Sequence, residues 1–296
     1  MESGKTADFV KIHVLGIGSF FSKRSFYPSI VLEYNGEFTA VDPTANLEYA
    51  LNTYRIVSGE GLQAKDIAQA CITHAHLDHS GGMVDLAVEK YYAELKRRSG
   101  ERFTFFGPES VLDACWNRML IDTLRETFRY VDPEYSTREL EFDDIFNLVK
   151  LQPEMEKDVG SLEVVAKKGI HASPGGSFGY RFNCGGILIG YSGDTAPSLD
   201  GVDDLTKFLS GCDMIMYESG MHRIGGHTSY EFLDGRLKPA ERVFLTHYPD
   251  TLANDEDMLP FKLLKPGRCY VVTKQGVEEK PITEKGRQLV EIIGGN

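Results

Sequence analysis

The stretch THAHLDHSGG, residues 73–82, constrains this chain more than any other part of it. Three histidines and one aspartate fall within six positions, and they are His74, His76, Asp78 and His79. Histidine and carboxylate ligands together suit zinc, manganese or iron, and the lack of a cysteine between them argues against a purely structural zinc site. Alternate residues of an extended segment point the same way, so His74 and His76 can bind one ion. A turn would let Asp78 and His79 face a second ion.

Four ligands cannot complete two ions, so further ligands must come from later in the chain. Three polar residues directly follow apolar runs: His171 after VVAKKGI, Asp194 in LIGYSGDT and His247 in VFLTHYPD. With the first cluster they make five histidines and two aspartates, a set that suits two ions with one carboxylate between them. Two divalent ions a few ångströms apart can activate a water and polarise a phosphoryl or carbonyl oxygen.

Apolar runs that end in polar residues recur along the chain, and helical spacing is concentrated in its middle. The predicted helices cover 83–100 and 109–128, while 130–158 is interpreted as part helix and part loop. The predicted strands or strand groups are 9–19 with a glycine turn, a hairpin at 29–44, 67–72, 103–108, three strands in 161–195, 212–220, 241–250 and one last strand in 268–280.

This order of elements predicts an α/β fold in which two sheets pack together and helices flank them. Polar residues gather at strand ends, so we expect the site at one rim of the sheets. No glycine-rich break or polar linker separates the halves of the chain. We therefore predict a single domain over residues 1–296, with a mostly helical insertion at about 84–158.

The motifs resemble those of the metallo-β-lactamase superfamily. THAHLDHSGG matches its HxHxDH signature, GYSGDT and LTHYPD match its later metal motifs, and the resemblance runs from LGIGS to THYPD. It implies a four-layer αβ/βα sandwich and two divalent ions, zinc first, with manganese or iron as alternatives. The implied ligands are His74, His76 and His171 for the first ion, Asp78, His79 and His247 for the second, and Asp194 as the bridge.

A second set of motifs is similar to the ribonuclease Z branch of that superfamily. LGIGSFFSKRSFYPSIVLEYNG resembles its opening, HASPGGSFGYRF its third motif, and MYESGMHRIGGHTSYEFL its Glu and His-Thr pair, here Glu218, His227 and Thr228. The resemblance implies that His227 lies beside the scissile phosphate and that Glu218 orients it. An imidazole can protonate a leaving oxygen, and a carboxylate fixes its tautomer. Asp78 would orient the attacking water, which makes Asp78, His227 and Glu218 the catalytic candidates.

One departure from ribonuclease Z changes the expected substrate. Processing forms carry a long basic tRNA-binding arm between the third-motif histidine and the bridging aspartate, whereas His171 and Asp194 are only 23 positions apart here. Cyclic-nucleotide phosphodiesterases, including phage anti-Pycsar enzymes, are similar in this set of motifs. We therefore predict a phosphodiesterase for small nucleotide phosphodiesters such as cyclic nucleotides. The alternatives are a tRNA 3′-end endonuclease, a hydrolase of a carboxylic ester or lactone, and a metal-binding sensor without turnover.

Charge and cysteine content limit the binding partners and the cellular location that we expect. A formal net charge of −12 does not favour broad nucleic-acid binding, which needs clustered lysine and arginine. The five cysteines are far apart and form no CxxC motif, which predicts reduced thiols in a cytoplasmic protein. We expect no signal peptide at the start of the chain and no membrane partner, because no apolar run has the length of a membrane span. Many relatives in the resembled family are homodimers, so we expect a homodimer.

Three further features allow two interpretations each. Asp42, which precedes a proline, either caps that turn or hydrogen-bonds a ligand histidine, and we favour the hydrogen bond. GIGS, residues 16–19, predicts a short glycine turn between strands in preference to a phosphate cradle. Tyr180 and Arg181 either contact the substrate or serve strand packing.

Overall fold

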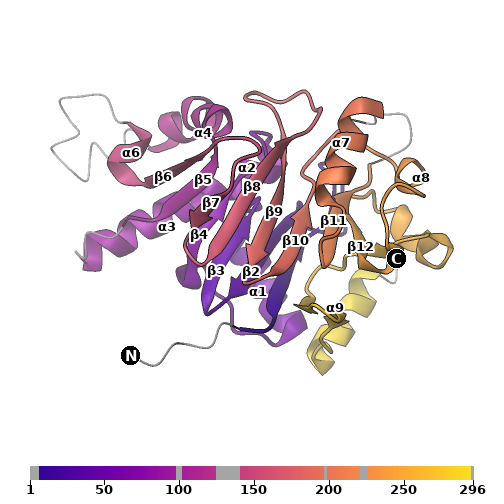
Figure 1. Cartoon of the computed structure of the whole chain (residues 1–296). Helices are drawn as coiled ribbons and strands as arrows, with labels where there is room; N and C mark the ends of the chain where they lie inside the picture. The colour runs from indigo at the N-terminus through magenta and orange to yellow at the C-terminus, as the bar shows by residue number, and fades with distance from the viewer. Residues whose placement is uncertain (1–6, 98–101, 125–140, 197–198, 221–225, 295–296) are drawn as a thin grey trace.

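Two mixed β-sheets face each other and helices lie around their outer sides (Figure 1). The computed structural model describes residues 7–97, 102–124, 141–196, 199–220 and 226–294. Within these ranges the sheets have eight and seven strands. This arrangement is the αβ/βα sandwich that the motifs predict, and the prediction of the fold class is confirmed.

The first sheet has the strand order β15-β14-β1-β2-β3-β4-β5-β6. Its strands are β1 (Val10–Gly16), β2 (Ser29–Tyr34), β3 (Glu37–Val41), β4 (Ile67–Cys71), β5 (Thr104–Pro108), β6 (Asn147–Leu151), β14 (Cys269–Thr273) and β15 (Gly276–Glu279). Strands β15 to β3 pair antiparallel, whereas β3 to β6 pair parallel. Parallel neighbours need a crossover connection, and the chain between β3 and β6 provides it with helices.

The second sheet has the strand order β13-β12-β11-β10-β9-β8-β7. Its strands are β7 (Lys157–Val159), β8 (Leu162–Lys168), β9 (Phe178–Cys184), β10 (Ile187–Tyr191), β11 (Met214–Glu218), β12 (Val243–Thr246) and β13 (Lys262–Leu263). Strands β7 to β10 form an antiparallel meander, and β10 to β13 pair parallel. Both sheets therefore have a parallel half whose strands end at a common rim.

Four of the described helices have eleven or more residues, and the others are shorter, as the bounds of all eight show. They are α1 (Leu47–Ser58), α2 (Leu77–Ser80), α3 (Gly82–Arg97), α4 (Glu109–Cys115), α6 (Phe142–Ile145), α7 (Leu199–Leu209), α8 (Tyr230–Leu233) and α9 (Glu284–Gly294). Shorter turns are the 3₁₀ segments η1 (Ala64–Asp66), η4 (Ala240–Arg242) and η5 (Leu252–Met258), and the π-helical turn η2 (Trp116–Leu120). Among the described residues no helix has the length and apolar character needed to cross a membrane.

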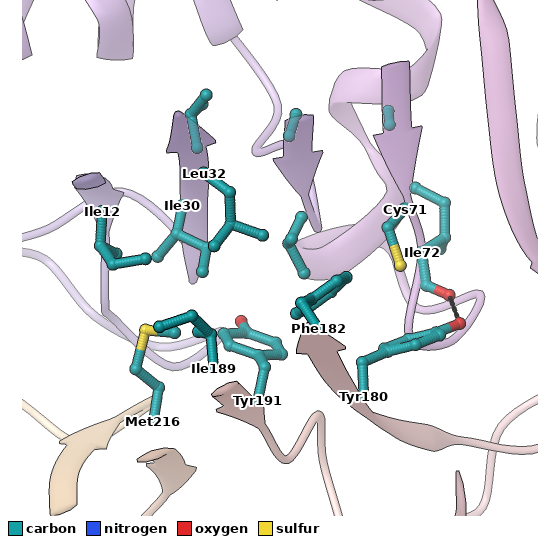
Figure 2. Packing of buried hydrophobic residues seen from close by; sticks show 14 of the residues in the cluster. Ile12, Ile30, Leu32, Cys71, Ile72, Tyr180, Phe182, Ile189, Tyr191 and Met216 are labelled. Atoms are coloured by element: carbon teal, nitrogen blue, oxygen red, sulfur yellow. Dashed lines mark hydrogen bonds between the residues drawn. The ribbon is translucent and has the colours of Figure 1, made fainter. Parts of the chain in front are cut away.

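The main core lies between the two sheets. Figure 2 shows Ile12 and Ile30 of the first sheet opposite Ile189, Tyr191 and Met216 of the second. All five are at most 1% exposed. Full burial of a side chain of this size stabilises the fold by about 1.5–3 kcal/mol, so this interface fixes how the two sheets sit on each other. Their common rim is thereby a rigid base for a site.

Most predicted strands are confirmed by the structure, including the hairpin at 29–44 and the buried strand before the histidines. The Asn35–Gly36 turn of that hairpin has the two positive φ values that a tight two-residue hairpin turn requires. The three strands predicted in 161–195 are β8, β9 and β10. All five cysteines are free, as predicted, and the structure also buries all of them.

Three expectations about secondary structure are wrong. Strand β6 lies where we predict helix and loop, because an edge strand with half-buried residues shows little periodicity. The last predicted strand is the hairpin β14–β15, which turns at Lys274–Gln275 without a glycine between the strands. Helices α1 and α9 are not among the predicted elements. The range 84–158 contains helices α3, α4 and α6 as predicted, but also two strands of the first sheet, β5 and β6; its part 125–140 lies outside the described residues.

Candidate metal centre

Three histidine side chains from separate segments meet at the rim of the sandwich. His74 and His76 follow the carboxyl end of β4, and His171 follows β8. Nδ1 of His76 lies 3.1 Å from Nε2 of His74 and 3.1 Å from Nε2 of His171. Three ring nitrogens this close together can bind one cation, so the predicted first group is assembled by the fold.

A second group lies beside the first one. Asp78 and His79 belong to the short helix α2, and His247 directly follows β12. Nε2 of His247 lies 3.3 Å from Oδ2 of Asp78, and Nε2 of His79 lies 3.7 Å from the same oxygen. These three residues are buried and can also hold one ion. The helical turn of α2 separates this group from the first, as the sequence predicts.

Asp194 lies between the two groups. Its Oδ1 is 3.3 Å from Nε2 of His79 in the second group. Its Oδ2 is 3.8 Å from Nε2 of both His74 and His171 in the first group. One carboxylate thus faces both sets of ligands, the placement that a bridging ligand requires. The loop that carries Asp194 follows β10, so two strands of different sheets deliver the two sides of the site.

The donor set fits divalent metal ions. Nε2 of His79 and Oδ1 of Asp194, which lie 3.3 Å apart, are buried and make no hydrogen bond with the described part of the chain. Buried polar atoms are nearly always satisfied, so atoms without partners at one point indicate a ligand. Five imidazoles and two carboxylates make a mixed set typical of zinc, manganese or iron sites. The clusters are therefore consistent with a dinuclear metal site.

The side chains alone shift each other's protonation equilibria. Burial, reinforced by neighbouring His79, holds the pKa of His74 well below its usual range. Burial also acts to lower the pKa of His79, but the carboxylates of Asp194 and Asp78 outweigh it and raise that pKa well above the usual range. Burial acts to raise the pKa of Asp194, yet the nearby His247 and His79 hold it well below its usual value. The shifts of His74 and Asp194 favour the neutral imidazole and the carboxylate that bind a metal, whereas His79 would release a proton when it binds one.

Asp42 lies behind His79, and the structure contains the predicted hydrogen bond between Asp42 and a histidine of the cluster. Nδ1 of His79 donates to Oδ2 of Asp42 over 2.8 Å. The same carboxylate accepts bonds from the backbone N–H and the hydroxyl of Thr73, each at 2.7 Å. Asp42 has a φ of 50° and His247 a φ of 53°. The left-handed conformation costs a non-glycine residue about 1–2 kcal/mol, and such residues concentrate at functional sites.

His171 is held in one orientation by the backbone. Its Nδ1 donates to the carbonyl oxygen of Gly226 over 2.7 Å, because a carbonyl can only accept. This bond leaves Nε2 as the free acceptor that faces His76 and Asp194. Fixing one ring nitrogen in this way selects the tautomer that can bind a metal through the other.

Glu218 and His227 form the predicted pair next to the metal ligands. Oε2 of Glu218 accepts a hydrogen bond from Nδ1 of His227 over 3.0 Å. Its Oε1 accepts bonds from the backbone N–H groups of Thr195 and Thr228, so the carboxylate is fixed. Burial acts to lower the pKa of His227, but the bond to Glu218 outweighs burial and raises that pKa to about 9. A protonated His227 next to the metal ligands can donate a proton.

A cavity of about 490 Å³ opens onto these residues. Its lining includes five of the seven proposed ligands, since His74 and His79 lie deeper. Residues that the sequence analysis did not single out also line it, and they are Phe20, Phe21, Ser22, Lys23, Leu77, Gly220, Pro249, Asp250 and Thr251. Ser19, the last residue of the GIGS turn, lines it too. The two adjacent phenylalanines after a glycine turn are the sequence signal that could have found them.

The structure bears on two open interpretations. Tyr180 belongs to the core between the sheets, where its hydroxyl donates to the carbonyl of Ile72 over 2.7 Å (Figure 2), and Arg181 lies over the ring of Phe208. Gly16 serves backbone packing, because a Cβ there would lie 2.1 Å from the carbonyl oxygen of Tyr27, whereas Ser19 at the end of the same turn lines the cavity. Gly16 therefore lets the loop after β1 fold back closely.

Two facing mixed sheets with this histidine and aspartate cluster at the rim define a protein of the metallo-β-lactamase fold. A family model described as "Anti-Pycsar protein Apyc1" matches residues 10–270, so the chain belongs to the family of anti-Pycsar protein Apyc1. Anti-Pycsar protein Apyc1 of Bacillus phage vB_BsuM-Goe3 is 26% identical over 261 residues, which cover 83% of this chain and 91% of the relative.

Solved structures of low sequence identity share the fold. YhfI from Bacillus subtilis, a metallo-β-lactamase fold protein, superposes with a TM-score of 0.65 at 16% identity, covering 89% of this chain and 100% of YhfI. The short form of human tRNase Z superposes with a TM-score of 0.59 at 20% identity, covering 88% of this chain and 98% of the human one.

Proposed function

We propose that this protein is a dinuclear-metal-dependent phosphodiesterase that hydrolyses small nucleotide phosphodiesters, with cyclic nucleotides as the substrate class. The single observation that carries this proposal is the convergence of two ligand groups around Asp194, next to the Glu218–His227 pair. The family name adds support, since by name these proteins counter Pycsar, a cyclic-nucleotide signalling system.

The described residues divide into ligands for two ions. His74, His76 and His171 would hold one ion, and Asp78, His79 and His247 the other, with Asp194 between them. Two bound dications would supply Lewis acidity toward the phosphodiester oxygens and offset the carboxylates that otherwise repel an anionic substrate. Zinc is the ion that we propose, with manganese or iron as alternatives.

His227 is placed to move a proton at the leaving oxygen. Its Nδ1 is engaged by Glu218, and its ring lines the cavity, so Nε2 is the nitrogen available to a substrate. The hydrogen bond to Glu218 raises the pKa of this imidazole, which favours its protonated form. When a cyclic phosphodiester opens, the departing ribose oxygen needs one proton, and Nε2 of His227 would donate it. Asp78 would orient the attacking water through its carboxylate.

The connection between His171 and Asp194 favours a small substrate over tRNA. It contains strands β9 and β10, which pair antiparallel in the second sheet, and no separate basic arm. The net charge of −12 gives no broad attraction for a polynucleotide. The cavity of about 490 Å³ lies within the range of roughly 300–1,000 Å³ that is usual for small-ligand sites.

The test is a substrate panel on purified protein loaded with zinc or manganese. It compares bis(p-nitrophenyl) phosphate, purine and pyrimidine cyclic nucleotides, a precursor tRNA and a carboxylic ester, with His74→Ala as the control for contaminating activity. We expect a higher kcat/KM for at least one cyclic nucleotide than for the tRNA or the ester. A tRNA cleavage efficiency above that of every cyclic nucleotide would assign the chain to tRNA processing instead. Homodimer formation and a cytoplasmic location remain predictions.

A further inference from the structure

Two exposed phenylalanines stand at the mouth of the metal cavity. Phe20 is 50% exposed and Phe21 is 80% exposed, and both line the cavity together with Leu77, which is 55% exposed. Single exposed apolar side chains are common, but two adjacent aromatic rings and a leucine at the rim of one cavity are not. Such a rim gains stability by covering its apolar surface with a ligand.

The rings are arranged as a supported platform. Phe20 stacks on Tyr27 with the ring centroids 5.7 Å apart and the planes 5° apart. Phe21 contacts Phe20 edge to face, with centroids 5.5 Å apart and planes at 82°. Phe20 is therefore supported from one side by Tyr27, and Phe21 is the outermost of the three rings.

The loop that carries both rings is fastened to the metal site. Asp250, three residues beyond His247, accepts a bond from the hydroxyl of Ser22 over 2.5 Å and one from the backbone N–H of Lys23 over 2.8 Å. The backbone of Gly18 also forms a bridge to Tyr248. The aromatic pair thus keeps a defined position relative to His247, although 228 positions separate Ser22 from Asp250.

The two ends of the cavity differ in chemistry. One end carries the histidines and carboxylates that would hold a phosphodiester through metal ions, and the other carries the two phenyl rings. Lys23 is the cation that the described lining adds beside the rings. A nucleotide has the same division, with an anionic phosphodiester at one end and a planar aromatic base at the other.

We infer that Phe21, held edge to face by Phe20, is a stacking platform for the nucleobase of the substrate and that Asp250 positions it, an inference that rests on the proposed function. Stacking uses the face of a base, which every base has, and reads no pattern at its edge. The platform therefore accepts purines and pyrimidines alike, with the larger purine ring held more tightly.

Steady-state kinetics of the metal-loaded full chain test the platform. The substrates are cyclic AMP and its base-free counterpart, ribose 3′,5′-cyclic phosphate. We expect the wild type to have a KM about tenfold or more lower for cyclic AMP, in line with the strength of base–aromatic stacking, and Phe21→Ala to lose most of this difference. Phe21→Trp should retain it, and so should Phe9→Ala, which removes a phenylalanine that is 42% exposed but lies outside this cavity.

The positioning role of Asp250 has its own readout. Asp250→Ala removes the acceptor of two bonds to the loop and leaves both rings in the chain. We expect a higher KM for cyclic AMP with a small change in kcat, the same split that Phe21→Ala shows. A fall in kcat with an unchanged KM would assign Asp250 to the metal site and overturn its positioning role.

A measurement without turnover separates this inference from the proposed function. Trp116 is the only tryptophan of the wild type and is buried, so Phe21→Trp adds one exposed fluorophore. We expect 5′-AMP to quench its fluorescence and inorganic phosphate to leave it unchanged. If 5′-AMP quenches the fluorescence but no cyclic nucleotide is hydrolysed, the proposed phosphodiesterase function is refuted while the nucleotide platform stands. An unchanged KM ratio in Phe21→Ala or an absence of quenching would overturn the platform. A change of oligomeric state in Phe21→Ala, measured by light scattering, would also overturn it, because a second copy of the chain would then cover the rings.

Discussion

Nδ1 of His79 donates a hydrogen bond to Asp42 over 2.8 Å, and both side chains are fully buried. The bond turns Nε2 of His79 toward Asp78 and Asp194, the two carboxylates that share its ligand group. Among the proposed ligands Asp42 bonds directly to His79, and it is linked to His74 only through the hydroxyl of Thr73, which lies 3.0 Å from Nδ1 of that ring. Hydrogen bonds of this kind fix the ring and make the nitrogen a better ligand.

Asp42→Asn should therefore weaken metal binding by the second ligand group. We expect a loss of about 10–100-fold in affinity for one of two ions, the range typical for removal of a supporting carboxylate. The first group, His74, His76 and His171, should keep its ion. Titration against a chromophoric chelator measures both steps, with the exposed Asp158→Asn as the control. If both metal affinities were unchanged, the hydrogen bond from His79 to Asp42 would not be needed for metal binding.

The number of ligands sets the expected metal content. Seven candidates exceed the four ligands of one tetrahedral ion, so elemental analysis should find about two divalent ions per chain. His76→Ala should bind about one ion and lose turnover, because Nδ1 of His76 lies between the other two histidines of its group. One ion or fewer in the fully loaded wild type would contradict the dinuclear assignment.

The proposed ligands stand out in the sequence because polar residues follow apolar runs that form buried strands. His74, Asp194 and His247 lie within three residues of the ends of β4, β10 and β12, and the packing of the two sheets brings these strand ends to one rim. The bond from His79 to Asp42 was predictable for the same reason, since Asp42 directly follows β3.

The aromatic rim of the cavity could not be predicted in this way. Phe20 and Phe21 lie in a loop whose position depends on Asp250, 228 positions beyond Ser22. No local pattern encodes such a pairing. Strand β6 was missed because its residues are half-buried at a sheet edge and follow neither a clear strand period nor a clear helix period.

A partly buried ion pair away from the site links stability to pH. Glu33 accepts a bond from Nε2 of His13 at 3.0 Å and from Nζ of Lys11 at 2.9 Å. The bond from His13, with help from Lys11, outweighs burial and lowers the pKa of Glu33 from 4.5 to about 2. A folded-state pKa below the unfolded one means that ionised Glu33 stabilises the fold above pH 4.5. That contribution is lost as the pH falls through the range from 4.5 to about 2.

Glu33→Gln should therefore lower the free energy of unfolding at pH 7 by about 1–2 kcal/mol, after allowance for solvent screening of this partly exposed carboxylate. The deficit relative to wild type should shrink steadily below pH 4.5. Urea denaturation at a series of pH values measures it, with the exposed Glu156→Gln as the control. A deficit that is equal at pH 3 and pH 7 would show that lost packing, and not lost charge, causes it.

His227→Ala should separate proton donation from metal binding. His227 is not among the proposed ligands, so the variant should keep two ions and its melting temperature. Loss of a donor to the leaving oxygen acts in the transition state, so kcat for cyclic nucleotides should fall by about 10²–10⁴-fold with a modest change in KM. The effect should be smaller for bis(p-nitrophenyl) phosphate, because p-nitrophenolate leaves without a proton.

Glu218→Gln should show a weaker form of the same pattern, since it disturbs only the orientation of the ring. Loss of metal in His227→Ala would show that His227 is itself a ligand. The geometry allows this outcome, because Nδ1 of His227 lies 3.6 Å from Oδ2 of Asp194. A wild-type rate on cyclic nucleotides would leave His227 without a role in the reaction.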